Sequence, residues 1–253
     1  MDEPQNNRNS KERIIDTAAR LFSEKGFDGA RVNDIAREAE VNKALIYYYF
    51  PSKQAILTHI IDSFFQDMLG LGMDFIRDAM AVMVREGRLT IYADKMHFST
   101  PEDLQEFKQA TYGYYLLVYR YMMKKRDSLR IILSEALRGG SQRNALFRFF
   151  MSAGEGSGSN PLFDAVSAVG TDISYSKEVV FRKFFFSLLP IINIVVFQED
   201  YKAAAGLSDS EMLDFYTRSL DVTFAAYVSN QDILMDTDEI RRYHFLKGGD
   251  TDG

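Results

Sequence analysis

The stretch VNDIAREAEVNKALIYYYFPSK, from Val32 to Lys53, decides how the rest of the chain is organised. Its first half places apolar residues at helical spacing, which predicts a helix with one buried face: Val32, Ile35, Ala36 and Ala39. Glu40 and the next residue make a corner, and Asn42 is a favoured N-cap for a second helix that runs to Phe50 and is stopped by Pro51. Two short helices joined by such a turn form the unit that places its second helix in the DNA major groove.

The second helix of this unit has two different sides. The side expected to pack against the first helix holds Val41, Ile46 and Phe50. The opposite side pairs residues four apart, Lys43 with Tyr47 and Ala44 with Tyr48. A cation, phenolic hydroxyls and a small residue suit a surface that approaches phosphates and base edges. The alternative is that the tyrosines are half-buried packing. Three consecutive tyrosines cannot all point inward on a two-turn helix, so we expect at least one to be exposed.

These residues resemble the signature of the tetracycline-repressor (TetR) family of bacterial transcription regulators. The resemblance rests on the pattern IAxxAxVxxxxxYxYF with a following Ser-Lys pair, which stands here as Ile35, Ala36, Ala39, Val41, Tyr47, Tyr49, Phe50, Ser52 and Lys53. Upstream, RIIDTAARLFSEKGFDG from Arg13 to Gly29 resembles the first helix of that family and the loop after it. The resemblance covers the first sixty residues or so, and beyond them only length and helical character agree.

The resemblance implies an all-α protein, with a three-helix helix-turn-helix DNA-binding domain followed by a larger helical domain for ligand binding and dimerisation. The boundaries we expect are a disordered arm over residues 1–9, the DNA-binding domain over 10–55, the helical domain over 56–230 and a C-terminal extension over 231–253. Ser10 is expected to cap the first helix and Gly26 to end it. Ser52 is expected to cap a helix that joins the two domains and moves as a lever between them, with a break at Gly70 and Gly72.

The chain departs from the family pattern at three positions. Glu40 stands where the family usually has a glycine, at a turn position expected to need a left-handed backbone. A non-glycine residue there costs on the order of 1 kcal/mol, so either Glu40 is strained or the turn is built differently. Arg31 replaces the usual Ser or Thr cap, which forfeits a cap and adds a possible phosphate contact. Leu45 stands where a hydroxyl residue is common, and its side chain can touch a thymine methyl instead.

The predicted DNA contacts divide into two groups. Phosphates are assigned to Arg31, Asn42, Lys43, Tyr47 and Lys53, and base edges to Ala44, Leu45 and Tyr48. Overall charge adds little to this prediction. The chain has a net charge of −6, and residues 1–60 contain nine basic and nine acidic side chains, which leaves 21 minus 27, or −6, on the remainder. The motif therefore carries the case for DNA binding.

The remainder reads as a series of helices. We expect a helix rich in aromatic residues over 102–125, a helix from an Asp127 cap to Arg138, a short helix over 143–152 and a flexible loop over 153–161. A largely apolar or aromatic effector is expected among Tyr112, Tyr115, Tyr119, Phe147 and Phe150, although each of these residues is at least as well explained as core.

The most hydrophobic segment is 176–199. Its longest uncharged run, Phe184 to Gln198, falls short of the ~20 residues that a membrane span requires, and Pro190 predicts a kink. A last long helix is expected after Ser208 or Asp209. In proteins that this one resembles, the two C-terminal helices pack against a second copy. The resemblance therefore implies a homodimer interface at Phe185, Leu189, Ile192, Phe215, Leu220 and Phe224.

Other chemistry leaves no trace in the sequence. Cysteine is absent, which excludes disulfides and thiolate chemistry and fits a cytoplasmic location; residues 1–10 are polar and do not resemble a signal peptide. His59, His97 and His244 lack metal-ligand spacing, and no nucleotide-binding, hydrolase or zinc-protease motif is found. We therefore expect no cofactor, no metal and no enzymatic activity.

The sequence predicts a dimeric DNA-binding transcriptional regulator, a repressor released from a palindromic operator by a small apolar or aromatic ligand. One alternative is a helical adaptor or apolar-ligand carrier that has lost DNA binding. It is suggested by the zero net charge of residues 1–60 and by Glu40 and Leu45 in the helix-turn-helix unit. Another is a membrane-associated protein that uses Phe184 to Gln198. A steep loss of DNA affinity with salt favours the regulator.

Overall fold

The computed structural model describes residues 5–91, 96–139, 142, 144, 165, 168, 169, 185 and 188–228. The first helix, α1, spans Gln5–Gly29. Prediction of a cap at Ser10 was wrong, because Ser10 is buried inside this helix, and residues 5–9 of the predicted arm are helical.

Gly26 interrupts α1 near its end, with φ 72° and ψ 162°. Such a backbone suits glycine, because a side chain would be strained there. A Cβ at this position would lie 2.8 Å from Nη1 of Arg138, the flexible end of a side chain that can move aside, so the backbone conformation and not space requires glycine. The expected end of the first helix at Gly26 is therefore a kink, followed by one more helical turn to Gly29.

Helices α2 (Val32–Glu38) and α3 (Lys43–Tyr49) form the predicted helix-turn-helix unit. Arg31 precedes α2 and makes no side-chain cap, as expected. Asn42 caps α3, because its Oδ1 accepts a hydrogen bond of 2.7 Å from the Leu45 amide. Glu40 has φ 53° in the turn between them, so the left-handed backbone inferred from the sequence is present.

Helix α4 (Lys53–Phe75) follows at once, capped by Ser52, whose Oγ accepts a hydrogen bond of 3.1 Å from the Ala55 amide. The predicted break at Gly70 and Gly72 was wrong, because the helix passes through both glycines. Buried residues on either side hold this helix, and their packing outweighs the ~1 kcal/mol that a glycine costs in a helix. The regular helix gives way instead at a π-helical segment, η1 (Ile76–Met80), and continues as α5 (Ala81–Arg85).

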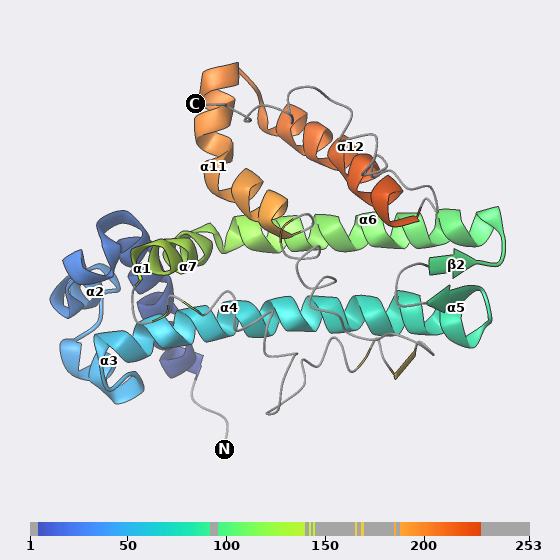
Figure 1. The fold of residues 1–253 in the computed structure, drawn as a ribbon. Coiled ribbons are helices and arrows are strands. Elements are labelled where there is room, and N and C mark those ends of the chain that lie inside the picture. The colour runs from blue at the N-terminus through green and yellow to red at the C-terminus, as the bar shows by residue number, and fades with distance from the viewer. Residues whose placement is uncertain are drawn as a thin grey trace, which may run out of the picture.

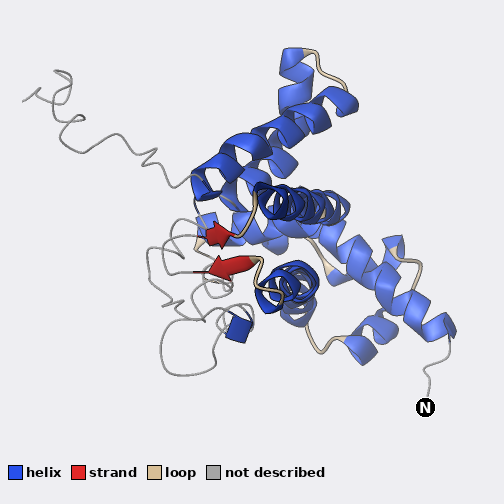
Figure 2. Ribbon diagram, turned by 90° about the vertical axis from the view of Figure 1, so that its right-hand side faces the viewer, coloured by secondary structure: helices blue, strands red, loops and turns tan. Residues whose placement is uncertain are grey.

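Two short antiparallel strands lie between α5 and the next helix: β1 (Leu89–Ile91) and β2 (Met96–Phe98), in which Leu89 pairs with Phe98 and Ile91 with Met96. Figure 2 views α4 and α6 nearly end-on and shows these strands beside the helix ends. Helix α6 (Pro101–Lys124) then runs back along α4 (Figure 1). Thr100 and Asp103 form a capping box at its start.

Helix α7 (Arg126–Arg138) returns the chain to α1 (Figure 1). Asp127 lies in its first turn and Lys125 occupies the cap position, so the predicted Asp127 cap was wrong by two residues. An acid in the first turn still interacts favourably with the helix dipole. Gly139, with φ 67°, ends the helix as expected. The predicted helix over 143–152, the loop over 153–161 and the extension over 231–253 lie outside the described residues.

The C-terminal pair is α11 (Leu189–Ala205) and α12 (Asp209–Val228). Pro190 lies in the first turn of α11, where the missing amide costs nothing. Most of the helix expected before it, over residues 176–187, lies outside the described residues, so the kink at Pro190 stays a prediction. Ser208 is the cap of α12: its Oγ accepts from the Glu211 amide at 3.3 Å, and its own amide donates to Glu211 Oε2 at 2.8 Å. No helix in the described ranges is long and apolar enough to cross a membrane.

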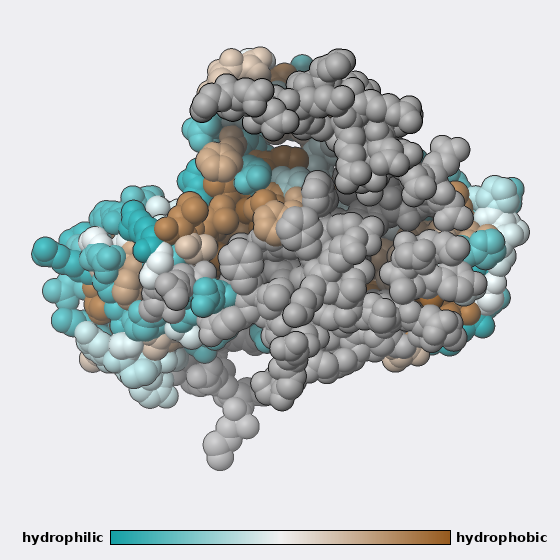
Figure 3. Space-filling model, viewed as in Figure 1, coloured by the Kyte–Doolittle hydropathy of each residue, from teal (hydrophilic) through white to brown (hydrophobic). Residues whose placement is uncertain are grey.

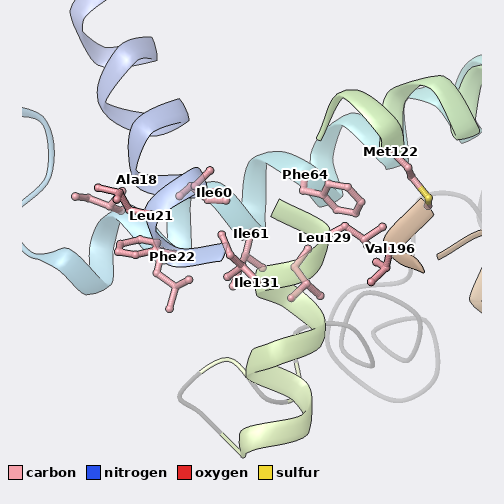
Figure 4. Packing of buried hydrophobic residues seen from close by; sticks show 14 of the residues in the cluster. Ala18, Leu21, Phe22, Ile60, Ile61, Phe64, Met122, Leu129, Ile131 and Val196 are labelled. Carbon is pink, nitrogen blue, oxygen red and sulfur yellow. The ribbon is translucent and has the colours of Figure 1, made fainter. Parts of the chain in front are cut away.

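One hydrophobic core joins both parts of the molecule. Figure 4 shows Ala18, Leu21 and Phe22 of α1 meeting Ile60, Ile61 and Phe64 of α4, with Leu129 and Ile131 of α7, Met122 of α6 and Val196 of α11. A second, smaller core at the hairpin end contains Ile76, Met80, Met83, Leu89, Ile91 and Phe107. Helices α4 and α6 contribute to both regions, so the helix-turn-helix unit is rooted in the larger helical body.

Candidate nucleic-acid interface

The recognition helix α3 is anchored by one side and exposed on the other. Ile46 and the following Phe50 are buried. Tyr47 is 47% exposed and Tyr48 is 72% exposed, while Tyr49 is half-buried. The expectation that at least one tyrosine faces outward is therefore confirmed. Large aromatic side chains left in solvent at the end of a molecule are available to a partner.

Polar and small groups accompany these tyrosines on the exposed side. The Lys43 ammonium lies 5.8 Å from the centroid of the Tyr47 ring, and Ala44 is exposed beside them. Leu45 is half-buried, so only part of its side chain can reach a base. Asn42 is exposed, and its oxygen is committed to the cap of α3, which leaves the amide NH₂ as its outward donor.

A groove of about 350 Å³ lies between α3 and the connection from α1 to α2, lined by Asp28, Ala30, Arg31, Val32, Asn33, Lys43, Tyr47 and Lys53. Three of these residues are cations and one is an acid. Arg31 is exposed here, at the uncapped start of α2. The groove therefore combines positive charge with a phenolic hydroxyl, which are the groups that hold a phosphate backbone.

Lys53 departs from the predicted arrangement. Its Nζ donates hydrogen bonds of 2.7 Å to the Phe27 carbonyl and 3.0 Å to the Ala30 carbonyl. The same ammonium lies 4.3 Å from the centroid of the Phe27 ring. Two of its three donors are thus occupied by the protein itself. No local sequence pattern indicates these bonds, because they join residues more than twenty positions apart.

Ion pairs on the surface orient α2 against α1. Arg20 of α1 pairs with Glu24 at 3.2 Å and also with Glu38 of α2. The hydrogen bond from Arg20 holds the pKa of the Glu38 carboxyl below its usual value. Arg37 pairs with Asp34 at 2.9 Å within α2. These pairs are solvent-exposed, so each contributes little to stability and more to the orientation of the helix.

His59 contacts Phe50, the last buried residue of the helix-turn-helix unit. Its ring centroid lies 5.3 Å from that of Phe50, and the Lys11 ammonium lies 6.0 Å from the centroid of the same Phe50 ring. Burial and the nearby charge of Lys11 lower the pKa of His59 below its ordinary 6.5, with Asp62 acting in the opposite direction. The imidazole is therefore neutral at pH 7 and packs as an aromatic ring.

The predicted effector residues among the described ones are Tyr112, Tyr115 and Tyr119 on α6, and the last two contact the C-terminal helices. The buried Tyr119 donates a hydrogen bond of 2.9 Å to Gln198 Oε1 and stacks on Tyr216 at 4.8 Å between centroids. The Tyr216 hydroxyl donates to the Tyr115 carbonyl at 3.2 Å. Tyr112 packs against both hydrophobic cores. Phe147 and Phe150 lie outside the described residues, and an effector pocket here stays a prediction.

The predicted dimer face needs correction. Ile192 and Leu220 are buried inside their own chain, because α11 and α12 turn these residues toward α6 and α7. Phe185 and Phe215 are exposed and Leu189 is half-buried, whereas nothing is described for the side chain of Phe224.

Sequence reasoning missed Phe197 and Tyr201, each 55% exposed and four residues apart on α11. Their spacing, on the side of α11 away from the buried Ile192 and Val195, was a usable signal. They border a groove of about 500 Å³ between α11 and α12, lined by Asn193, Ile194, Phe197, Gln198, Tyr201, Met212, Phe215, Tyr216 and Ser219. Figure 3 shows apolar residues gathered around α11, whereas polar residues cover the end that carries α1 to α3.

Within the described part of the chain, no group of three or more His, Asp or Glu residues is placed to hold a metal ion.

Comparison with known proteins finds a family that matches the helix-turn-helix unit. Residues 14–60 match the family described as "Bacterial regulatory proteins, tetR family". The probable HTH-type transcriptional regulator YttP of Bacillus subtilis is 42% identical over 57 residues, which are 22% of this chain and 28% of that protein. The biofilm operon icaADBC negative transcriptional regulator IcaR of Staphylococcus aureus is 52% identical over 46 residues, which are 18% of this chain and 25% of that protein.

The chain thus spans about a quarter of the length of these relatives. Among solved structures, one putative TetR-family regulator from Mesorhizobium loti overlaps 90% of this chain and 100% of its own, with 18% identity and a TM-score of 0.46. That likeness is too weak to support an inference, and the assignment rests on residues 14–60.

Proposed function

We propose that this chain, which belongs through residues 14–60 to the TetR family of bacterial regulatory proteins, is a dimeric and sequence-specific DNA-binding transcriptional regulator. One observation supports this proposal most directly: α3 presents Lys43, Tyr47 and Tyr48 to solvent while Ile46 and Phe50 hold it from behind. An exposed helix of this kind, preceded by a supporting helix, fits the major groove.

The exposed side chains divide into those suited to contact phosphates and those suited to contact base edges. Lys43, Tyr47 and Arg31 border the groove beside α3 and are suited to phosphates. Ala44, Tyr48 and the half-buried Leu45 face outward from α3 and are suited to base edges, where a methyl or aromatic group can contact thymine. Two copies of α3 related by a two-fold axis would enter major grooves about 34–36 Å apart, one DNA turn, on a near-palindromic site.

The dimer is proposed to form through α11 and α12. Phe197, Tyr201 and Phe215 are exposed there beside the groove between the two helices. Aromatic side chains are enriched in the cores of homodimer interfaces, and such a surface is costly to leave in water. This assignment keeps Phe215 from the predicted interface and replaces the buried Ile192 and Leu220 with Phe197 and Tyr201.

Release from DNA by a small apolar or aromatic ligand completes the proposal. IcaR is described as a negative regulator, and we propose repression for this chain as well. Helix α6 offers aromatic side chains to a ligand and is tied to the connecting helix α4. The Tyr121 hydroxyl donates to Asp67 Oδ2 at 2.8 Å, and the rings of Tyr121 and Phe64 lie 5.6 Å apart. A ligand that binds better to one position of α6 would shift α4, and with it the spacing of the two recognition helices.

Selection of duplexes from a random pool by the purified full-length protein tests this proposal. The expected result is enrichment of a palindrome whose half-sites are one helical turn apart, together with a dimeric mass in solution. Failure to bind any duplex at low salt would refute the regulator and favour an adaptor or ligand carrier.

A further inference from the structure

Lys53 is the first residue of α4, yet its ammonium group binds carbonyl oxygens at the end of α1. Its ammonium donates to the carbonyls of Phe27 and Ala30 at 2.7 and 3.0 Å and lies 4.3 Å from the centroid of the Phe27 ring. Three separate contacts therefore converge on one half-buried cation. A lysine held in this way has a single N–H left for any outside partner.

The end of α1 explains why a cation is needed there. The last carbonyls of a helix have no amide partner within the helix, and they form the negative end of its dipole. The final turn, Gly26 to Gly29, contains no basic residue and one acid, Asp28. Lys53 supplies from α4 the capping charge that α1 lacks in its own sequence. The ammonium also rests on a fixed surface, because the Phe27 ring packs edge-on against the buried Phe22 at 5.4 Å.

Lys53 lies where the end of α1, the start of α2 and the end of α3 meet, and we call this meeting point the junction. It lies three residues after Phe50, which ends α3, and one after Ser52, which caps α4. The carbonyl it holds at Ala30 lies directly before Arg31, where α2 starts. The Lys53 side chain therefore holds the start of α2 and the segment that follows α3 against the end of α1.

We propose that Lys53 is a positioning residue for DNA recognition, which fixes the α2–α3 unit on α1 and α4 and does not neutralise a phosphate. This inference rests on the proposed DNA-binding function. Lys43 provides the matched comparison, because it lines the same groove, is exposed, and lies over the Tyr47 ring with its ammonium open to solvent.

Hydrogen exchange on the free full-length protein tests the junction without DNA. Lys53→Met keeps the length and apolar stem of the side chain and removes the ammonium. The expected result is faster amide exchange over residues 26–34, with exchange unchanged in α6 and α7, because local opening loses one of its restraints. Lys43→Met should leave exchange over 26–34 as in the wild type. Equal exchange in Lys53→Met and wild type would overturn the inference.

The salt dependence of DNA binding separates positioning from phosphate contact. Affinity for the selected duplex is measured by fluorescence titration between 50 and 200 mM salt, at a temperature where circular dichroism shows both variants folded. A role in stability alone would leave the affinity of the folded protein unchanged. We expect Lys53→Met to bind about tenfold more weakly at every salt concentration with the wild-type slope, because it loses geometry and no counterion-releasing contact.

Lys43→Met should instead make the slope of log K against log salt shallower by about 0.9, as the loss of one phosphate contact requires. The same shallower slope in Lys53→Met, or unchanged affinity at all salt concentrations, would overturn the positioning role. A wild-type protein that selects no duplex would refute the proposed function and the recognition role together. In that case the exchange experiment still decides whether Lys53 holds the junction.

Discussion

Replacement of Glu40 by glycine should stabilise this protein. Glu40 has φ 53° and is the one non-glycine residue with positive φ in the described part of the chain. An L-residue in this region costs roughly 1–2 kcal/mol, whereas glycine adopts it freely. Glycine also gives the unfolded chain more conformational freedom, which offsets about 0.4–1 kcal/mol of that stabilisation. The net effect expected for Glu40→Gly is an increase of about 0.5–1 kcal/mol in the free energy of unfolding, or about 1–4 °C in Tm.

Thermal and urea unfolding followed by circular dichroism measure this change, and Glu40→Ala is its control. Alanine removes the carboxylate but keeps a Cβ in the left-handed region, so it should not be stabilised. Both variants should bind DNA at least as well as the wild type, because each removes a negative charge from the exposed turn beside α3. A Tm for Glu40→Gly at or below that of Glu40→Ala would refute the claim that this turn stores backbone strain.

Three other predictions follow from the recognition helix, His59 and the C-terminal pair. Lys43→Ala and Tyr47→Phe should each weaken DNA binding without lowering Tm, since both side chains are exposed; unchanged affinity for both in a titration would contradict the docking of α3. His59 has a pKa below 6.5 in the folded protein, so the unfolded chain takes up its proton first and stability should fall as pH drops below about 6.5. Urea unfolding at a series of pH values should show a smaller loss in His59→Gln, and an equal loss would exclude His59 as its source. Phe197→Glu should shift the protein toward monomer in sedimentation experiments, whereas Leu137→Glu, at an 86% exposed site on α7, should not.

Local signals in the sequence were sufficient to predict the helices and caps of the helix-turn-helix unit. The caps at Asn42 and Ser52 each depend on a few neighbouring residues, so side-chain chemistry alone predicts them. The left-handed turn at Glu40 was expected only from the family resemblance, because glycine is usual at that position. The helical class and the run of α6 were likewise predictable, because apolar periodicity over more than twenty residues leaves little choice.

Features set by distant contacts could not be predicted. The bonds of Lys53 to Phe27 and Ala30 exist only after α4 has packed against α1. Periodicity marked Ile192 as apolar, but it does not say whether an apolar side faces a neighbouring helix of the same chain or a second copy. The hairpin escaped notice because three-residue strands carry too little alternation to stand out.

The π-helical segment Ile76–Met80 has a consequence for how this protein tolerates changes in length. Along α4 and η1, buried residues recur every fourth position from Ile60 to Met80. In a regular α-helix this spacing drifts by about 40° at each step, and the wider π turn compensates for the drift. A π turn holds one residue more than an α turn, so loss of a single residue within this segment would restore a regular α-helix and leave Met83 facing the same neighbours. The same loss within α4 would rotate everything beyond it by about 100°. A change in length by one residue should therefore be tolerated better within Ile76–Met80 than along α4.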